Sequence, residues 1–500
     1  MNRIIRTSLY CCLLIIFWAT ANPVNAQEDS VDRSPYCWSE WWDFNGMTSS
    51  STIIRDDNTY RIIHSQILDN TIGIFVHTFV IHKYSSGQDF VFKTTFGATD
   101  FNDYSISITD MEIFDGFCYF CGSKIYDAVD MGGNPYSEGF VGKFSITALF
   151  SNYNYMEYNT VAKTRILRAL TITIPTNKSS IALVHLVGEM DYWNNYAACI
   201  AELEQTTPYT WVSTLDYLPG TPKIYFSDIQ RVASGVILAA QMACSNNYPY
   251  GSPTYDPNHQ QFLLDGFSLS GCHHDHITSS PSNMALYTMD HNNDYCFHLN
   301  KAPMKLCQGY GGLYLAFGVW ENNNQNSGLR VFKFSYSSPF SFDENSYYKM
   351  GGLSHEILDM VCPPYHYPIL LSKGTPYNKG IISIPPFVDP SQTAVDTYFD
   401  NDMYIQSLSV PPTNNFIDIS GSKSANNQLM RYRQDYTAWN ENSCFEKAPK
   451  DRIEMPFLQY QVFSVTWQFK DELRPFEWDS EKAYLVEVGE NNICSECENK

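Results

Sequence analysis

The sequence predicts an all-β protein, a β-propeller-like array of about seven four-stranded blades, with six and eight as neighbouring counts. A strand–turn–strand phrase recurs along the chain, and helical periodicity is nearly absent. Tyr and Phe number 35 and 31, whereas charged residues make up only 17% of the chain. A repeated unit built from strands is typical of propeller blades with variable loops. Aromatic side chains also pack well on pleated sheets.

The recurring phrase is clearest from Ile108, where it reads ITDMEIFDGFCYFCG. Each copy holds a short apolar strand, two to five turn-type residues and a second strand that ends in small residues. The residue before the first apolar position serves as an anchor, and the anchors are Asp110, Ala169, Asp228, Asn283, Asp359 and Ser407. Strand-like runs at 60–68, 72–84 and 89–95 precede them. We interpret these runs as a first blade with a degenerate anchor, which brings the count to seven.

Residues 1–26 have the pattern of a signal peptide. Arg3 and Arg6 precede a mostly apolar run at 8–19, and Val24-Asn25-Ala26 offers small residues for cleavage before Gln27. The apolar run is shorter than the roughly 20 residues of a membrane helix, and no second stretch approaches that length. The sequence therefore predicts an exported protein, periplasmic, cell-surface or secreted, with no integral membrane segment.

The mature chain is expected to be acidic. The whole sequence carries a formal net charge of −21, and removal of the leader would take away two arginines. Nucleic acids and anionic membranes attract clustered Lys and Arg, so this balance argues against both as partners. Neutral glycans, peptides and cations remain compatible with this charge as partners. The alternative is that the excess carboxylates only keep the protein soluble.

The predicted organisation has three parts after the leader. Residues 27–45 form a polar segment that ends in a Trp-rich patch, and residues 46–436 hold the blades. Residues 437–500 contain further strand-like runs and a Cys-containing tail. Those C-terminal strands either close the ring or form a small appended segment.

The phrase D-M-x-I-x-D-G-x-x-Y-F-C-G from Asp110, the leader and the Tyr- and Asn-rich blades resemble uncharacterised exported propeller-like proteins of Bacteroidetes-type bacteria. The resemblance covers roughly residues 60–436. It implies a cell-envelope or extracellular setting and supplies no catalytic residues. Trp-Asp repeat ends, kelch spacing and the S-x-D-x-G-x-x-W box of sialidases are missing from the sequence.

Cysteines of an exported chain are expected to pair in part. Cys296 and Cys307 flank one loop and are the best local candidates. Cys494 and Cys497 indicate a terminal disulfide, either between the two or to Cys444. Cys118 and Cys121 are three residues apart in a predicted strand, so their side chains should point to opposite faces and pack as small hydrophobic groups.

The densest cluster of metal-ligand residue types is Cys272-His273-His274-Asp275-His276. His274 and His276 would share a face of an extended segment, and imidazole suits Zn²⁺. The cluster follows a glycine in a predicted loop, so the sequence favours solvated histidines, with a metal site as the alternative. No bound cofactor is predicted.

Loop tyrosines supply the main binding signal, and those on predicted loops include Tyr248, Tyr250, Tyr255, Tyr365 and Tyr367. Such residues make good surfaces for sugars or proteins. We therefore predict a non-catalytic scaffold that binds an extracellular or envelope protein or glycan through loop aromatics. The alternative is a polysaccharide hydrolase or lyase that uses carboxylates near the propeller axis. Repeated aspartates such as Asp110, Asp115, Asp228 and Asp359 more often cap turns, which favours the first hypothesis.

Overall fold

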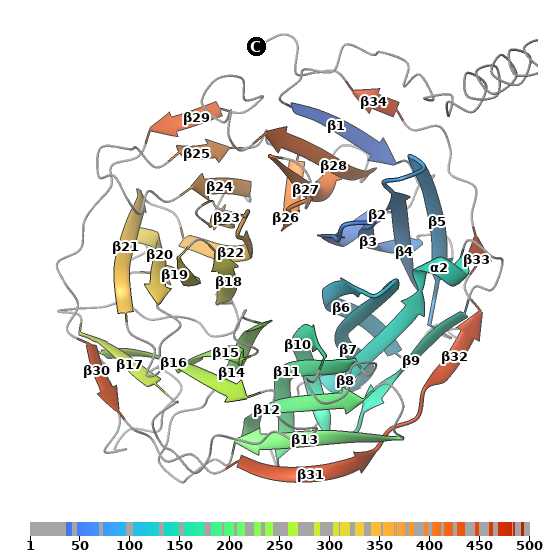
Figure 1. Ribbon diagram of the computed structural model, residues 1–500, viewed down its shortest axis with the longest axis horizontal. Coiled ribbons are helices and arrows are strands. Elements are labelled where there is room, and N and C mark those ends of the chain that lie inside the picture. The colour runs from blue at the N-terminus through green and yellow to red at the C-terminus, as the bar shows by residue number, and fades with distance from the viewer. Residues whose placement is uncertain are drawn as a thin grey trace, which may run out of the picture.

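The computed structural model consists of antiparallel sheets arranged around a single axis (Figure 1). The residues that it describes are 37–42, 48–69, 74–96, 104–129, 135–149, 155–174, 182–192, 195–204, 208–215, 225–231, 236–243, 259–268, 285–290, 304–309, 311–320, 326–334, 342–351, 354–364, 366, 368–375, 380–384, 395–398, 403–411, 415–423, 428–435, 446–449, 460–463, 469–482, 484–485 and 492–494. Seven sheets lie within these ranges, so the predicted seven-bladed β-propeller is confirmed.

The first three blades follow one another along the chain, each running from the axis outward. Blade 1 contains β2 (Thr48–Asp56), β3 (Tyr60–Asp69), β4 (Ile74–Lys83) and β5 (Gln88–Thr94). Blade 2 contains β6 (Tyr104–Phe114), β7 (Phe117–Val129), β8 (Pro135–Ser145) and β9 (Tyr155–Val161), with the short helix α2 (Ile146–Leu149) after β8. Blade 3 contains β10 (Thr164–Thr173), β11 (Leu183–Tyr192), β12 (Asn195–Glu204) and β13 (Tyr209–Leu215).

The next three blades repeat this order. Blade 4 contains β14 (Tyr225–Arg231), β15 (Val236–Ala243), β16 (His259–Ser268) and β17 (Ala285–Asp290). Blade 5 contains β18 (Lys305–Gly309), β19 (Gly312–Trp320), β20 (Asn326–Phe334) and β21 (Phe342–Gly351). Blade 6 contains β22 (Ser354–Val361), β23 (Ile369–Thr375), β24 (Gly380–Ile384) and β25 (Val395–Tyr398).

One anchor assignment needs correction. The position Asn283 lies outside the described residues and just before β17, which is the fourth strand of blade 4. The fifth blade begins at β18, and its residue equivalent to the other anchors is Lys305, because Lys305 pairs with Ala316 as Asp110 pairs with Cys121. The sequence missed this unit because β18 is only five residues long and begins with a lysine.

Blade 7 is built from both ends of the chain. Its strands β26 (Met403–Ser409), β27 (Phe416–Lys423) and β28 (Gln428–Asp435) are followed in space by β1 (Cys37–Trp42). Strand β1 pairs antiparallel with β28 over six positions, from Cys37 opposite Gln434 to Trp42 opposite Leu429. An N-terminal strand therefore completes the last blade and closes the ring (Figure 1).

Charged side chains reinforce the same junction between blades 7 and 1. Arg61 Nε lies 2.8 Å from Asp418 Oδ2 and 3.2 Å from Asp56 Oδ1, while Arg433 contacts both oxygens of Asp418 at 2.5 and 2.7 Å. Burial alone would raise the pKa of Asp418, but the neighbouring Arg61 and Arg433 lower it below its ordinary value. We refer to Asp56, Arg61, Asp418 and Arg433 as the junction cluster.

The C-terminal segment forms a belt around the outside of the propeller. Its strands are β29 (Glu446–Pro449), β30 (Tyr460–Phe463), β31 (Phe469–Pro475), β32 (Asp479–Lys482), β33 (Tyr484–Leu485) and β34 (Asn492–Cys494). They pair in turn with blades 6, 4, 3, 2, 1 and 7, as the red arrows in Figure 1 show. The belt thus runs opposite to the blade order and adds a fifth strand to six of the seven sheets.

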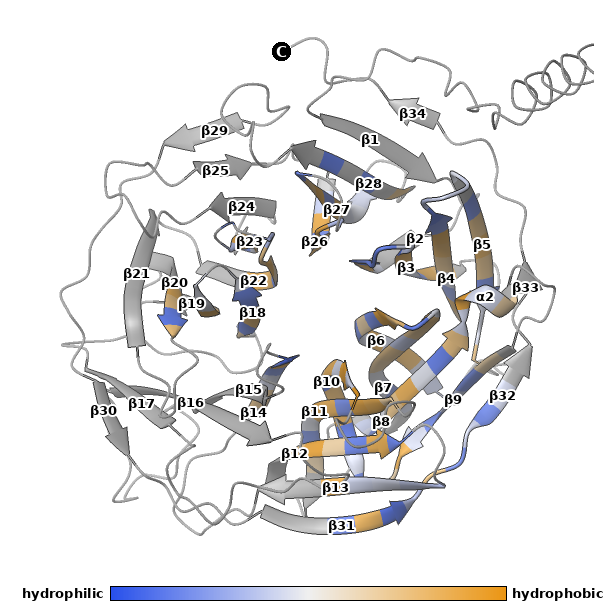
Figure 2. Ribbon diagram, viewed as in Figure 1, coloured by the Kyte–Doolittle hydropathy of each residue, from blue (hydrophilic) through white to orange (hydrophobic). Residues whose placement is uncertain are grey.

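The hydrophobic core lies between adjacent blades. One cluster joins blades 1 and 2 through Phe79, Phe92, Phe120 and Phe144, and a second joins blades 2 and 3. Figure 2 shows hydrophobic and hydrophilic residues alternating along strands such as β8 and β12, as expected for sheets that bury particular positions. The two buried cysteines of β7 follow this rule, because Cys118 packs in the first cluster and Cys121 in the second.

Within the described residues, no helix has the length and apolar character needed to cross a membrane. The predicted signal peptide at 1–26 lies outside the described residues, so export stays a prediction.

Candidate functional site

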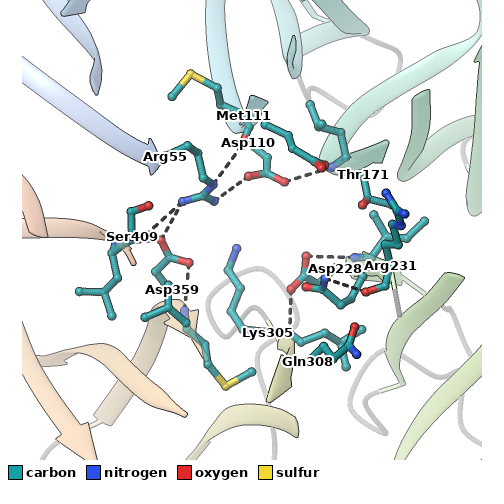
Figure 3. A pocket seen from close by; sticks show the side chains of 18 residues that line it. Arg55, Asp110, Met111, Thr171, Asp228, Arg231, Lys305, Gln308, Asp359 and Ser409 are labelled. Atoms are coloured by element: carbon teal, nitrogen blue, oxygen red, sulfur yellow. Dashed lines mark hydrogen bonds and ion pairs between the residues drawn. The ribbon is translucent and has the colours of Figure 1, made fainter. Parts of the chain in front are cut away.

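The innermost strands of all seven blades line one cavity of about 400 Å³ on the propeller axis. Its lining residues share a position near the anchor of their strand, and they include Arg55 of β2, Asp110 and Glu112 of β6, Thr171 of β10, Asp228 and Arg231 of β14, Lys305 and Gln308 of β18, Asp359 of β22 and Ser409 of β26. Figure 3 shows these side chains converging from separate blades. A cavity of this size suits a small ligand or the end of a longer one.

A β-bulge precedes the anchor in most inner strands. The pairing register shifts between Ile108 and Asp110, and equivalent shifts occur before Ala169, Asp228, Asp359 and Ser407. A bulge inserts one residue and changes the direction of the side chains beside it. The bulges therefore explain why a residue of ordinary strand sequence reaches the axis in each blade.

The small residues that end several copies of the recurring phrase accommodate these bulges. A Cβ atom on Gly122 would lie 1.8 Å from the carbonyl oxygen of Ser107, and one on Gly188 would lie 1.9 Å from that of Ile166. Gly421 faces the carbonyl oxygen of Tyr404 in the same way at 2.2 Å. The glycine and the bulge are thus two parts of one local structure that positions the anchor.

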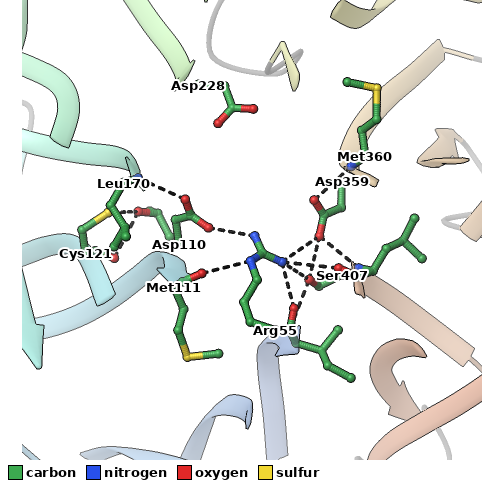
Figure 4. A network of polar contacts seen from close by, with 12 residues as sticks. Arg55, Asp110, Met111, Cys121, Leu170, Asp228, Asp359, Met360 and Ser407 are labelled. Carbon is green, nitrogen blue, oxygen red and sulfur yellow. Dashed lines mark hydrogen bonds and ion pairs between the residues drawn. The ribbon is translucent and has the colours of Figure 1, made fainter. Parts of the chain in front are cut away.

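Arg55 holds two of the anchor aspartates together across the axis (Figure 4). Its guanidinium lies 2.7 Å from Asp110 Oδ1 and 3.2 Å from Asp359 Oδ2, and it donates to Ser407 Oγ at 3.1 Å and to the Met111 carbonyl at 3.0 Å. Burial opposes the charge of Arg55, yet the carboxylates of Asp359 and Asp110 raise its pKa above the ordinary value. Arg55 therefore occupies the place that a cation would take between these carboxylates.

Each anchor aspartate also accepts a backbone N–H from the next blade. Leu170 donates to Asp110 Oδ2 at 3.1 Å, Leu306 to Asp228 Oδ2 at 2.7 Å and Leu408 to Asp359 Oδ2 at 3.0 Å. The sequence favoured aspartates that cap turns by accepting backbone N–H groups in the same way in each blade. The shared acceptor role is present in all three, but the turn is wrong, because the donors lie on the inner strand of the neighbouring blade. Asp115 does lie in a turn, where it and Gly116 have φ of 48° and 74° between β6 and β7. Those angles suit a two-residue hairpin turn.

Lys305 enters the cavity between Asp359 and Asp228, as Figure 3 shows. Among the described residues, no hydrogen bond or ion pair engages its ammonium group. Burial disfavours the charge, but the carboxylates of Asp228, Asp359 and Asp110 raise the pKa of Lys305 above its ordinary value. The ammonium group is therefore charged at neutral pH and has three N–H bonds to offer.

Two other carboxyl groups of the cavity, those of Asp228 and Glu112, have pKa values above their ordinary range. Burial raises the pKa of Asp228 to about 6, with Lys305 opposing that shift, and burial together with Asp110 raises the pKa of Glu112 to about 8. Glu112 accepts the Ile172 N–H at 3.1 Å, and the exposed Arg231 lies near enough to lower its pKa in part. At neutral pH the cavity thus combines an ionised Asp228 with a largely protonated Glu112.

Most of the predicted site residues lie outside the described residues. They are Tyr248, Tyr250, Tyr255, Tyr365, Tyr367, His274, His276, Cys296 and Cys497. Cys494 belongs to β34, but its side chain is not described. The loop-aromatic surface and the metal site accordingly stay predictions. No group of three potential metal ligands occurs among the described residues.

The disulfide pairing of Cys307 differs from the sequence expectation. Cys307 of β18 bonds Cys362, which follows β22, with the two Cα atoms 5.9 Å apart. Pairing of Cys307 with Cys296 is therefore wrong. The bridge joins the inner strands of blades 5 and 6, which are adjacent in space and 55 residues apart in sequence. Only the propeller arrangement brings these two strands together.

Sequence reasoning missed Arg55 and Lys305, two of the three cations that line the site. Lys305 stands at the position of the anchor aspartates, but the sequence did not reveal the copy of the phrase in its blade. In blade 1 the equivalent position is Ile53, because Ile54 donates its N–H to the Ser407 anchor as Leu306 donates to Asp228, and Arg55 lies two residues after it on β2. A usable signal was the lone basic residue next to apolar strand residues, which ends β2 in TIIRD before Asp57 and begins β18 in MKLC before Gln308. A basic residue with carboxylates at the equivalent positions of other blades indicates charge pairing at the axis.

The fold and the cavity define a seven-bladed β-propeller with an axial site. No family model matches the sequence, and no curated protein matches it. Trypanosoma rangeli sialidase is a similar solved structure, with a TM-score of 0.38 and 7% identity over 77% of this chain and 55% of that chain. The match therefore spans about half the length of the sialidase.

Two further solved structures share the arrangement of strands. The β-propeller domain of the Trilobed protease from Pyrococcus furiosus matches with a TM-score of 0.31 and 7% identity over 79% of this chain and 97% of that one. Polysaccharide lyase Uly1 matches with a TM-score of 0.30 and 9% identity over 77% of this chain and 89% of that one. These likenesses concern the fold alone and carry nothing about activity.

Proposed function

We propose that the protein is an extracytoplasmic, non-catalytic propeller that binds the end of a glycan in its axial cavity. The observation that carries this proposal is the state of the three anchor aspartates. Each accepts a backbone N–H from the neighbouring blade, and Arg55 joins two of them. Carboxylates engaged in this way are held in fixed positions within a rigid polar site, which favours binding over turnover.

The size and polarity of the cavity support a glycan over a protein partner. Protein interfaces cover broad surfaces, whereas about 400 Å³ accommodates a ligand of one or two sugar units. Thr171, Gln308 and Ser409 supply hydroxyl and amide groups around the charged residues. A sugar offers many hydroxyl groups that both donate and accept hydrogen bonds, and such a lining can satisfy them.

Two features support an extracytoplasmic location. The leader at 1–26 has the pattern of an export signal, and the Cys307–Cys362 disulfide is of the kind that persists in oxidising compartments. N-terminal sequencing of the protein from its native cell should give Gln27 or a neighbouring residue. An intact Met1 would contradict export by this route.

The binding proposal can be tested with the purified protein and a panel of oligosaccharides. Retention on a glycan array, followed by calorimetry, should reveal binding, while a reducing-end assay on the same samples should show no release of sugar. A Gln308→Leu variant should weaken binding, because it replaces a polar lining group with an apolar one. Full-strength binding by that variant, or no binding by the natural chain to any glycan, would contradict an axial glycan site.

The second candidate is a polysaccharide hydrolase or lyase. It is favoured by the different environments of Glu112 and Asp228, whose pKa values of about 8 and about 6 put a protonated acid and an ionised base in the same cavity at neutral pH. If the panel shows sugar release, the variants Glu112→Gln and Asp228→Asn decide between contamination and catalysis. Release lost in both variants would establish an enzyme and end the non-catalytic proposal.

A further inference from the structure

The position of Lys305 points to a particular class of ligand within the axial cavity. The side chain lies between Asp359 on one side and Asp228 on the other, and its ammonium group enters the open space (Figure 3). Among the described residues, no carboxylate oxygen lies within the 4.0 Å of a direct ion pair with Lys305. Opposite charges therefore face each other across gaps too wide for direct contact.

A gap of this kind suits a hydroxyl group. The ammonium N–H donates to the hydroxyl oxygen, and the hydroxyl hydrogen donates to the carboxylate, so one group satisfies both charges. An apolar group would leave both charges unpaired, which is costly in a partly buried site. An added anion would be drawn to Lys305 but would also lie close to Asp228 and Asp359.

The charge of the surroundings also argues against an anionic ligand. The charges of Arg55 and Lys305 are offset by those of Asp110, Asp228 and Asp359, so the centre of the cavity offers no surplus of positive charge. The formal net charge of the whole chain is −21, which repels a polyanion on approach. Arg231 is the other described cation of the lining, and it is exposed beside Glu112.

We infer that the axial cavity recognises a neutral sugar through two adjacent hydroxyl groups, which Lys305 binds together with Asp228 on one side and Asp359 on the other. The inference rests on the proposed glycan-binding function and names the chemistry of the ligand. Asp228 is the stronger acceptor for this purpose, because within the part of the chain that the structure describes its hydrogen-bond donors are the backbone N–H groups of Ile229 and Leu306. Asp359 is engaged additionally by Arg55 and Ser407.

The test uses two matched sets of probes. Neutral di- to tetrasaccharides of gluco, galacto, manno and xylo configuration form the first set, and their uronic-acid counterparts form the second. We expect binding to members of the neutral set, with dissociation constants that change less than about twofold between 50 and 500 mM salt, because screening affects an uncharged ligand little.

The variant Lys305→Met removes the ammonium group and retains a flexible side chain of similar length. It should weaken binding of the neutral probe by at least about tenfold, and Asp228→Asn should weaken it by a comparable factor. Lys333→Met is the control, because Lys333 lies on β20 of the same blade and does not line the cavity. A probe that lacks one of the two adjacent hydroxyl groups should lose a similar factor with the natural chain and little with Lys305→Met.

The outcomes separate this inference from the proposed function. Binding to no probe of either set would contradict the glycan-binding function itself. Salt-sensitive binding to the uronic-acid set that is lost in Lys305→Met would retain an axial glycan site and overturn the neutral-sugar inference. Neutral binding that is unchanged in both Lys305→Met and Asp228→Asn would overturn it as well, and circular dichroism of each variant controls for folding.

Discussion

The junction cluster and the axial cavity use the same residue types for different purposes. In the junction cluster, Arg61 is 2% exposed and Asp418 is 0% exposed, and guanidinium and carboxylate groups meet directly at 2.5–3.2 Å. In the cavity, Lys305 faces open space and its charge is opposed only across gaps. The comparison teaches that buried charge by itself does not mark a functional site. Accessible volume and unused hydrogen-bonding capacity do.

The largest expected effect is at the junction. Asp418→Ala should lower the free energy of unfolding by about 3–5 kcal/mol, because it leaves the buried Arg61 and the partly buried Arg433 without their shared carboxylate. Chemical denaturation monitored by fluorescence measures this loss. The control Asp89→Ala, which removes a partly exposed partner of His82, should cost less than about 1 kcal/mol. Similar losses in the two variants would contradict the structural role of the junction cluster.

A second prediction concerns a buried polar pair without a counter-ion. His64 Nε2 and His77 Nδ1 lie 3.0 Å apart in blade 1, and burial lowers the pKa of both, that of His77 to about 3. The unfolded chain binds protons near pH 6.5 while the folded chain does not, so stability is retained above pH 6.5 and falls as the pH drops below it. The loss should reach about 2 kcal/mol per histidine at pH 5.

Denaturation midpoints between pH 4 and 8 measure this effect. His77→Leu removes one titrating group, so its stability should depend less steeply on pH over the same interval. If the stability of the natural chain is constant from pH 7 to pH 5, the two histidines are protonated in the folded protein without loss of stability. That result would contradict the expected difference between this histidine pair and the junction cluster.

The third prediction addresses the structural part of the cavity. Arg55→Met should lower the free energy of unfolding by about 1–3 kcal/mol, because Asp110 and Asp359 keep their backbone donors but lose the cation between them. Arg55→Lys should recover less than half of the loss, since a single ammonium group cannot form the forked contacts of a guanidinium. Full recovery by lysine would indicate that charge alone matters here. Thermal unfolding at one pH is sufficient for the comparison.

The smallest effect on the free energy of unfolding is expected at Asp228, where substitution should raise the stability instead of lowering it. Because burial raises the pKa of Asp228 to about 6, its charge costs stability as the pH rises from the unfolded value of 3.8 through 6. A pKa shift of this size corresponds to about 3 kcal/mol at pH 7. Asp228→Asn removes this cost but replaces a carboxylate that accepts the N–H groups of both Ile229 and Leu306, so we expect a net stabilisation of about 1 kcal/mol at pH 7 together with weaker glycan binding. The gain should be lost below about pH 4. A destabilised variant at pH 7 would place Asp228 with the structural aspartates.

Part of the fold could be read from local pattern. The strand–turn–strand phrase around Asp110 is legible because its two strands are adjacent in sequence and joined by the Asp115-Gly116 turn, whose positive φ angles require such residues. The opposite-face packing of Cys118 and Cys121 followed from the two-residue period of a strand. Blade 5 was misplaced because β18 is short and its anchor is a lysine.

The belt was beyond sequence reasoning for a different reason. Residues 469–475 pair with β13, which lies more than 250 positions earlier in the chain. The sequence of such a short strand does not identify the strand with which it pairs. The choice of partner depends on which sheet edge the chain meets after blade 7 is complete. The same holds for Cys307, whose partner Cys362 is set by the adjacency of blades 5 and 6.

The sequence by itself determined the class of fold, the approximate blade count and the aspartates that recur along the chain, because strand periodicity and turn residues are local properties. Tertiary structure alone decided what those aspartates do. The bulges turn them to the axis, ring closure brings Arg55 between Asp110 and Asp359, and blade 5 places Lys305 in the space that remains. Electrostatic pairing depends on distance in space, and around a closed ring that distance is unrelated to separation along the chain.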